Sequence, residues 1–177
     1  MKKFILLCGL TSTMLLAGCI GGIVSSGANR VEVKLNSTAG NGVTGTVVFS
    51  EAGKKMRVVA EVTGLVPGAH GFHIHDKGDC SAPDGSSAGG HFNPFGKLHG
   101  RPDHAEHHGG DMPQLIADAK GVAKLVAYLD ELRIGDGEGE SDIVGRSVIV
   151  HASPDDFKTQ PTGNSGARQA CGVIVKK

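Results

Sequence analysis

The chain has few aromatic residues and no long uninterrupted apolar run. Among its 177 residues there is no Trp and only 1 Tyr. A helix that spans a bilayer needs about 20 predominantly apolar residues, but the most apolar stretch, residues 4–18, is interrupted by polar residues at 11–13. The formal net charge at pH 7 is zero, so the basic excess typical of nucleic-acid-binding domains is also absent. We therefore expect no permanent membrane-spanning segment and no nucleic-acid partner.

Glycine, in contrast, is abundant, and it indicates the fold class. The 28 Gly are distributed among short runs rich in Val and Ile, a composition typical of many turns that connect short strands. The length leaves room for one domain of about 150 residues with a single core, once an export segment is set aside. The sequence therefore predicts a single all-β domain.

The first residues have the pattern of an export signal. Lys2 and Lys3 precede the apolar stretch, which ends in the sequence Leu-Ala-Gly-Cys at 16–19. This ending resembles the bacterial lipoprotein signal box, in which the Cys thiol receives a diacylglyceryl group before the signal is cleaved. We expect a signal peptide at 1–18 and a lipid on Cys19. An ordinary secretory signal that happens to end near a Cys is the alternative.

A lipid on Cys19 would determine where the protein works. Two or more acyl chains hold a soluble domain on a membrane. Residues 19–30 contain Gly and Ser but little that can pack, so we expect a lipidated N-terminus and flexible tether there, followed by the folded domain at 31–177. The expected location is the cell envelope, with the domain anchored to a bacterial membrane on its extracytoplasmic side.

Four cysteines are present, and the export signal accounts for two of them. Cys8 would leave with the signal peptide and Cys19 would carry the lipid, which leaves Cys80 and Cys171. In an oxidising compartment these two thiols are expected to form a disulfide, which would tie the loop after residue 79 to the last strand. Two unrelated buried thiols are the alternative.

Short strands are predicted along most of the chain. Apolar and polar residues alternate at 31–35 and 56–62, which is typical of half-buried strands. About eight antiparallel strands would bury their inner faces as a sandwich or a flattened barrel. Two polar, glycine-rich segments, 77–113 and 153–167, do not fit, and long loops of this kind commonly carry function. The further strand candidates are 43–49, 71–75, 115–119, 122–129, 147–151 and 171–175.

Histidine is concentrated in the first of these loops and in the strand before it. All but one of the 9 His lie before residue 109. His73 and His75 are two residues apart on a predicted strand and therefore share one face, while Phe72 and Ile74 point into the opposite layer. This geometry lets both rings converge on one ion, although a His pair of this kind is weak evidence on its own.

A stronger pattern follows in the loop. His91, His99, His108 and Asp111 are separated by seven, eight and two residues. Three imidazoles and one carboxylate are sufficient to close a tetrahedral zinc site, and the loop has enough Gly and Pro to wrap around an ion. A solvated polar loop without a metal is the alternative.

Six segments, taken in their order and spacing, resemble the copper/zinc superoxide dismutase family, and the similarity extends over about residues 31–175. The resemblance implies an eight-stranded antiparallel Greek-key β-barrel or sandwich with a long zinc-binding loop and a second active-site loop. It also implies one copper and one zinc ion per subunit as cofactors, with superoxide as the substrate. The segments are GFHIH at 71–75, GHFNP at 90–94, LHG at 98–100, HGGD at 108–111, VH at 150–151 and GARQACG at 166–172.

Carried over position by position, the resemblance implies two metal sites that share one histidine. His91 would bridge the metals and act in catalysis by taking up and returning a proton. Arg168 would be the second catalytic residue, a fixed positive charge that docks the small anion. Asp155 would accept hydrogen bonds from His73 and His99 and orient both rings. The implied copper ligands are His73, His75, His91 and His151, and the implied zinc ligands are His91, His99, His108 and Asp111.

Three histidines are assigned to neither metal. The resemblance implies that His70 is a structural hydrogen-bonding residue, whereas His104 and His107 are expected in solvent or in a weak additional metal or haem site. The second loop also carries fewer charges than eukaryotic members use to guide superoxide. Lys77 and Lys97 are therefore candidates for that role.

The implied activity is dismutation of superoxide to dioxygen and hydrogen peroxide at a redox-cycling copper, with zinc in a structural role, which would protect the cell envelope. Two alternatives are a non-enzymatic exported protein that binds or stores copper and zinc on the same fold, and an adhesive or structural surface module. The complete copper set and Arg168 favour the enzyme, because a storage module needs no residue that docks an anion. The oligomeric state is open between a monomer and a homodimer.

Overall fold

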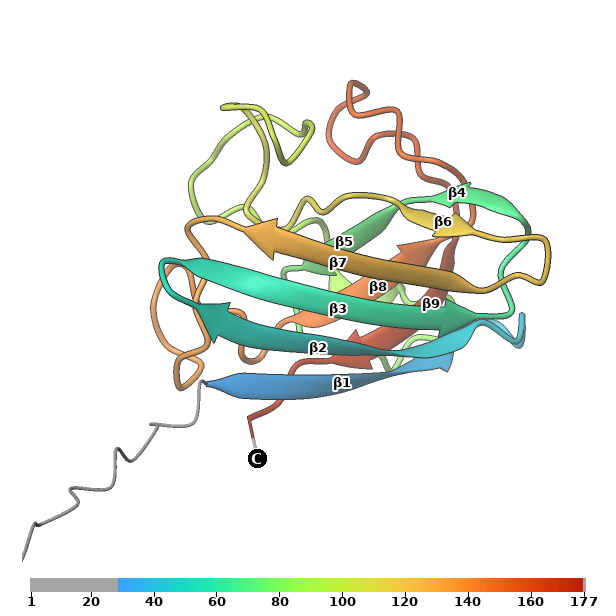
Figure 1. Ribbon diagram of the computed structural model, residues 1–177, viewed down its shortest axis with the longest axis horizontal. Coiled ribbons are helices and arrows are strands. Elements are labelled where there is room, and N and C mark those ends of the chain that lie inside the picture. The colour runs from blue at the N-terminus through green and yellow to red at the C-terminus, as the bar shows by residue number, and fades with distance from the viewer. Residues whose placement is uncertain (1–28, 177) are drawn as a thin grey trace, which may run out of the picture.

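The computed structural model describes residues 29–176, which form a single antiparallel sheet that curves into a nearly closed barrel (Figure 1). The order across the sheet is β4-β6-β7-β3-β2-β1-β9-β8-β5. The two end strands, β4 (Gly68–His70) and β5 (Phe72–His75), are separated in sequence only by Gly71. The other strands are β1 (Arg30–Ser37), β2 (Thr44–Ala52), β3 (Lys55–Thr63), β6 (Leu115–Ala117), β7 (Ala123–Leu129), β8 (Ser147–His151) and β9 (Arg168–Val173).

The all-β antiparallel prediction is confirmed, with nine strands in place of the predicted eight. The additional strand is β4, whose three residues are too few to show an alternating pattern in the sequence. The last strand was predicted at 171–175 but begins at Arg168, because a bulge at Gln169 in β9 lets the ladder with β8 extend from Val150–Ala170 to His151–Arg168. A single 3-10 turn, η1 (Ser86–Ala88), lies in the first long loop.

Burial along the strands explains how the barrel presents a site. In β1 and β3 buried residues alternate with exposed or half-buried ones, as expected for strands with one face on the core. In β5 every residue is buried. Phe72 and Ile74 belong to the hydrophobic core, while His73 and His75 have partners in the two long loops. The loops thus cover the face of β5 that the core does not use.

The two long loops lie on the same side of the barrel in Figure 1, where residues near 100 are yellow-green and residues near 160 are orange-red. The first connects β5 to β6 and the second connects β8 to β9. Within residues 29–176, no helix has the length and apolar character needed to cross a membrane. The predicted signal peptide at 1–18, the predicted lipidation site Cys19 and nearly all of the predicted tether at 19–30 lie outside the described residues.

Candidate metal centre

The fold brings the predicted ligands together as two groups of buried side chains that share His91. Within each group, one nitrogen or oxygen atom from every residue lies within 4.8 Å of the corresponding atoms of the others. One group consists of imidazoles alone and the other contains a carboxylate. The first group is His73, His75, His91 and His151, and the second is His91, His99, His108 and Asp111.

Neighbouring strands and loop carbonyls position the all-imidazole group. His75 and His151 lie at opposite ends of the paired strands β5 and β8, where His75 faces Ser147, and their side chains approach until the two Nε2 atoms are 3.4 Å apart. The other nitrogen of each ring, Nδ1, is hydrogen-bonded to a loop carbonyl. Nδ1 of His75 donates to the Gly89 carbonyl at 2.9 Å, and Nδ1 of His151 donates to the Gly166 carbonyl at 3.2 Å. Because Nδ1 is fixed in this way, Nε2 of each ring is available to an ion.

Asp111 organises the second group. Its Oδ1 lies 2.9 Å from Nδ1 of His91, 3.0 Å from Nδ1 of His99 and 3.6 Å from Nδ1 of His108. A tetrahedral zinc ion with bonds of about 2.0 to 2.1 Å places its ligand atoms about 3.3 Å apart, so these separations fit zinc. Oδ2 accepts the N–H groups of Gly100 and His108, which leaves Oδ1 to face the three rings.

Three ring nitrogens in these groups are buried and have no hydrogen-bond partner among the described residues: Nδ1 of His73, Nε2 of His91 and Nδ1 of His108. A buried polar atom without a partner costs about 1 to 3 kcal/mol. The other nitrogen of His73 contacts Asp155 and that of His91 contacts Asp111. Neutral imidazole nitrogens are ligands for both copper and zinc, and an ion in each group would supply the missing partners. The residues present therefore fit copper among the four imidazoles and zinc beside the carboxylate.

A second buried carboxylate joins the two groups. Asp155 Oδ2 accepts Nε2–H of His73 at 2.6 Å, and Asp155 Oδ1 accepts Nε2–H of His99 at 2.9 Å. The main-chain N–H of Asp155 donates to Gln114, and the N–H of Phe157 donates back to Asp155 Oδ1 at 2.7 Å. The carboxylate thus accepts hydrogen bonds from His73, His99 and the N–H of Phe157. It fixes the orientation of one ring from each group.

Burial and the carboxylates move the pKa values of the rings in opposite directions. Burial lowers the pKa of His91 to about 4 and that of His151 to about 3. Burial also opposes the charged form of His99, but hydrogen bonds to Asp111 and Asp155 outweigh it and raise the pKa of His99 to about 9. At neutral pH, His91 and His151 are therefore in the neutral form that metals bind, whereas His99 carries a proton that a metal must displace.

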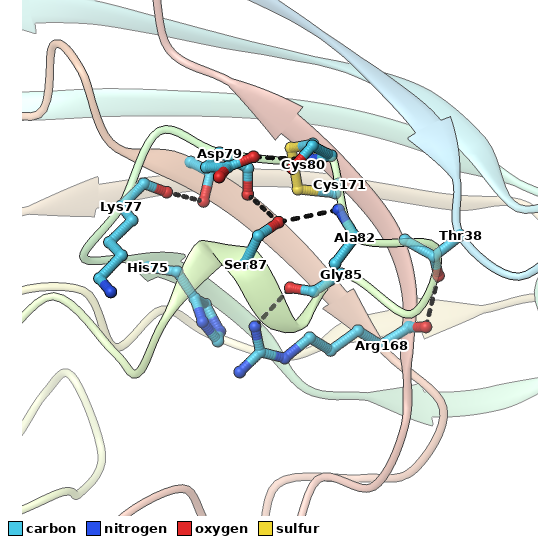
Figure 2. The surroundings of a disulfide bond; sticks show 12 residues. Thr38, His75, Lys77, Asp79, Cys80, Ala82, Gly85, Ser87, Arg168 and Cys171 are labelled. Atoms are coloured by element: carbon cyan, nitrogen blue, oxygen red, sulfur yellow. Dashed lines mark hydrogen bonds between the residues drawn. A yellow bond between two sulfur atoms is a disulfide. The ribbon is translucent and has the colours of Figure 1, made fainter.

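Arg168 lies beside the all-imidazole group. It is the cross-strand partner of His151 at the start of β9. Its Nη1 donates to the Gly85 carbonyl at 2.6 Å (Figure 2). Its Nη2 donates to the Gly89 carbonyl, also at 2.6 Å. The Gly89 carbonyl also accepts Nδ1–H of His75, so one carbonyl positions the guanidinium and a ring of the group. The half-buried guanidinium keeps three of its five N–H donors for other partners.

The predicted disulfide is confirmed. Cys80 and Cys171 are bonded, with their Cα atoms 5.8 Å apart and a sequence separation of 91 residues (Figure 2). The bond joins the loop that carries Gly85 and Gly89 to the strand that carries Arg168. It therefore holds the guanidinium and its two acceptors in one unit.

The histidines that were assigned to neither metal lie outside both groups. His70 is buried, and its Nδ1 and Nε2 each lie 2.8 Å from a carbonyl oxygen, those of His151 and Val66. His104 is exposed, and Nδ1 of the half-buried His107 donates to its carbonyl at 2.7 Å. Within residues 29–176, neither His104 nor His107 belongs to a group of three or more metal-ligating side chains.

The lysines that were candidates for guiding an anion have different surroundings. Nζ of Lys97 is 3.1 Å from a carboxylate oxygen of Glu131 and lies over the ring of Phe95. The side chain of Lys77 passes close to Gly89, whose carbonyl accepts Nδ1–H of His75. Lys97 is therefore already paired, and Lys77 is the better placed of the two.

Sequence reasoning missed the residues that act through the main chain or through side-chain amides. The carbonyls of Gly89 and Gly166 fix two rings, and Gln114 fixes Asp155. Gln160 contacts the main chain of His99 at both its N–H and its carbonyl. No spacing rule identifies such contacts, because they depend on the path of the loops.

Comparisons with known proteins agree with this chemistry. A sequence profile described as "Copper/zinc superoxide dismutase (SODC)" matches residues 43–174. The extracellular superoxide dismutase [Cu-Zn] of Onchocerca volvulus is 37% identical over 164 residues, covering 86% of this chain and 79% of the relative. Superoxide dismutase [Cu-Zn] 2 of Brassica juncea is 43% identical over 148 residues, covering 79% and 93%. The crystal structure of a double mutant of a SOD-like protein from Bacillus subtilis superposes with a TM-score of 0.73 at 37% identity, covering 82% of this chain and 97% of that one.

Proposed function

The chain belongs to the copper/zinc superoxide dismutase family, and we propose that it dismutates superoxide at a copper ion that His91 joins to a zinc ion. It is an enzyme, and its cofactors are copper and zinc. The observation that carries the bridging proposal is the position of the His91 ring. Its Nδ1 lies 2.9 Å from Asp111, a member of the proposed zinc set. Its Nε2 is buried and has no hydrogen-bond partner among the described residues, which leaves that atom for copper.

Two sets of residues would hold the ions. When bound, copper supplies one-electron redox chemistry and zinc supplies a fixed positive charge. Two superoxide ions and two protons give one dioxygen and one hydrogen peroxide, so the residues must dock an anion and deliver protons. The copper set is His73, His75, His91 and His151, and the zinc set is His91, His99, His108 and Asp111.

Arg168 is the residue that docks the anion. It is the cross-strand partner of His151, and it shares the Gly89 carbonyl with His75. Two guanidinium N–H groups are used by the loop carbonyls, and the remaining ones donate to superoxide. His91 would hold a proton at Nε2 whenever that atom is not bound to copper, and would deliver it to the reduced substrate. In the metal-free protein the pKa of His91, about 4, leaves Nε2 unprotonated and available to an ion at neutral pH.

The test is the superoxide dismutase activity of purified protein loaded with copper and zinc. His151→Ala removes one imidazole of the copper set and should abolish most of the activity. Arg168→Ala should reduce it about tenfold, within the range for loss of electrostatic guidance, and Arg168→Lys should restore part of it. If the wild type binds both metals but is no more active than free copper, the storage function replaces the enzymatic one.

We also propose that the protein is exported and lipid-anchored in the bacterial cell envelope. The motivating features are the Leu-Ala-Gly-Cys sequence that ends at Cys19 and the disulfide between Cys80 and Cys171, since disulfides persist in oxidising compartments. Metabolic labelling with a radioactive fatty acid should label the wild type and leave Cys19→Ser unlabelled. Label that persists in the variant would contradict the assignment.

A further inference from the structure

The main chain of His99 is held by a side chain and not by other main-chain groups. It lies in the irregular segment between β5 and β6, and among residues 29–176 no main-chain group bonds its N–H or its carbonyl. The N–H of Asp111, in contrast, donates to the carbonyl of His108 and closes a turn that contains two ligands. Phe92, which follows His91, donates to Ile74 of β5 at 2.8 Å. The residue that follows His91 is thus paired with a strand, whereas neither polar main-chain group of His99 has a main-chain partner among the described residues.

Gln160, in the second long loop, supplies the partners for both groups. Its Oε1 accepts the N–H of His99 at 2.9 Å, and its Nε2 donates to the carbonyl of His99, also at 2.9 Å. The side-chain amide therefore pairs with both polar groups of one residue, as a neighbouring strand would. Its Nε2 is also 3.3 Å from the carbonyl of Lys158, which holds the amide against its own loop.

The same loop also holds the ring of His99. Asp155 accepts its Nε2–H at 2.9 Å. With Gln160 on the main chain and Asp155 on the ring, only Nδ1 is left to face Asp111, at 3.0 Å. Two residues of the second loop thus determine where the zinc-facing nitrogen lies.

We propose that Gln160 is a positioning residue for His99, through which the second loop controls how tightly zinc is retained. The inference rests on the proposed assignment of His99 to zinc. Gln160 is itself exposed, so its replacement removes no core packing and should leave the barrel intact. Loss of outer contacts to metal ligands typically weakens metal binding 10- to 100-fold. For two hydrogen bonds to the main chain we expect the lower end, about tenfold.

The test measures zinc release from the purified full-length protein into excess coloured chelator, together with the visible spectrum of protein that carries Co²⁺ at the zinc site. Gln160→Met keeps the length of the side chain but loses both hydrogen bonds. Gln160→Glu keeps an acceptor for the His99 N–H and loses the donor. Thr159→Val is the matched control, because it removes a hydrogen bond of 2.6 Å to Asp156 in the same loop without touching His99.

We expect zinc to leave Gln160→Met about tenfold faster than the wild type, with an intermediate rate for Gln160→Glu and the wild-type rate for Thr159→Val. The Co²⁺ bands should shift in Gln160→Met and stay in place in the control. A wild-type rate in Gln160→Met, or equal acceleration in the control, would overturn the proposal. His99→Ala tests the underlying assignment separately: if zinc binding and the Co²⁺ spectrum survive that change, the zinc assignment fails.

Discussion

Zinc binding to the metal-free protein should become stronger with rising pH up to about pH 9. The reason is His99, whose pKa is raised to about 9 by Asp111 and Asp155 against the effect of burial. At pH 7.5 such a group is about 97% protonated, and zinc binds only the neutral ring. His91 requires no such deprotonation by zinc, because burial lowers its pKa to about 4.

The direction and size of this pH dependence follow from the raised pKa of His99. The proton on His99 stabilises the metal-free fold fully below the unfolded pKa of about 6.5, and this stabilisation is lost as the pH rises through about 9. The same proton competes with zinc over that range. Between pH 7 and pH 9 its removal should strengthen the apparent zinc affinity about 50-fold, equivalent to about 2.3 kcal/mol.

Competition with a chelator from pH 6.5 to pH 10, corrected for protonation of the chelator, measures this dependence. Calorimetric titration in two buffers with different ionisation enthalpies should show that His99 releases about one proton per zinc at pH 7.5. Asp155→Asn removes one carboxylate partner of His99 and should move the plateau to lower pH. The reasoning is refuted if the affinity levels off near pH 7, or if no proton is released at pH 7.5.

Three further changes test the structure around the site. The disulfide between Cys80 and Cys171 joins residues 91 positions apart. Replacing both with Ser should therefore lower the free energy of unfolding by about 4 to 5 kcal/mol in the chain-entropy model. Denaturant unfolding measures this loss, and a loss under about 1 kcal/mol would contradict the prediction. Gly163→Ala puts a Cβ against the carboxylate that joins the two metal groups and should weaken zinc binding in a chelator assay. Gly40→Ala, at a similar positive φ but with nothing within 4 Å, controls for backbone strain. Phe49→Ala in the core should cost about 3 to 5 kcal/mol in thermal unfolding, with metal stoichiometry unchanged.

The fold class was predictable where one face of a strand is buried, because the alternating pattern then appears in the sequence, as in β1 and β3. β4 was missed because a strand of three residues is too short to show an alternation of apolar and polar residues. The group of His91, His99, His108 and Asp111 was predictable from residue type and spacing, whereas His151 joined the other group only through the resemblance to the family. Gln160 and the carbonyl of Gly89 were not predictable, since their contacts depend on where a loop passes.

The two loops and the barrel have different tasks in this site. β5 and β8 carry His75 and His151, but the loop carbonyls of Gly89 and Gly166 bond Nδ1 of each ring and leave Nε2 for an ion. The loops have little regular structure of their own, so contacts such as those of Asp155 must hold them. Those contacts are made to the rings of His73 and His99, two of the proposed metal ligands. Each unpaired ring nitrogen costs about 1 to 3 kcal/mol when no ion is bound. Metal binding and the conformation of both loops therefore depend on each other, and a change in either one must alter the other.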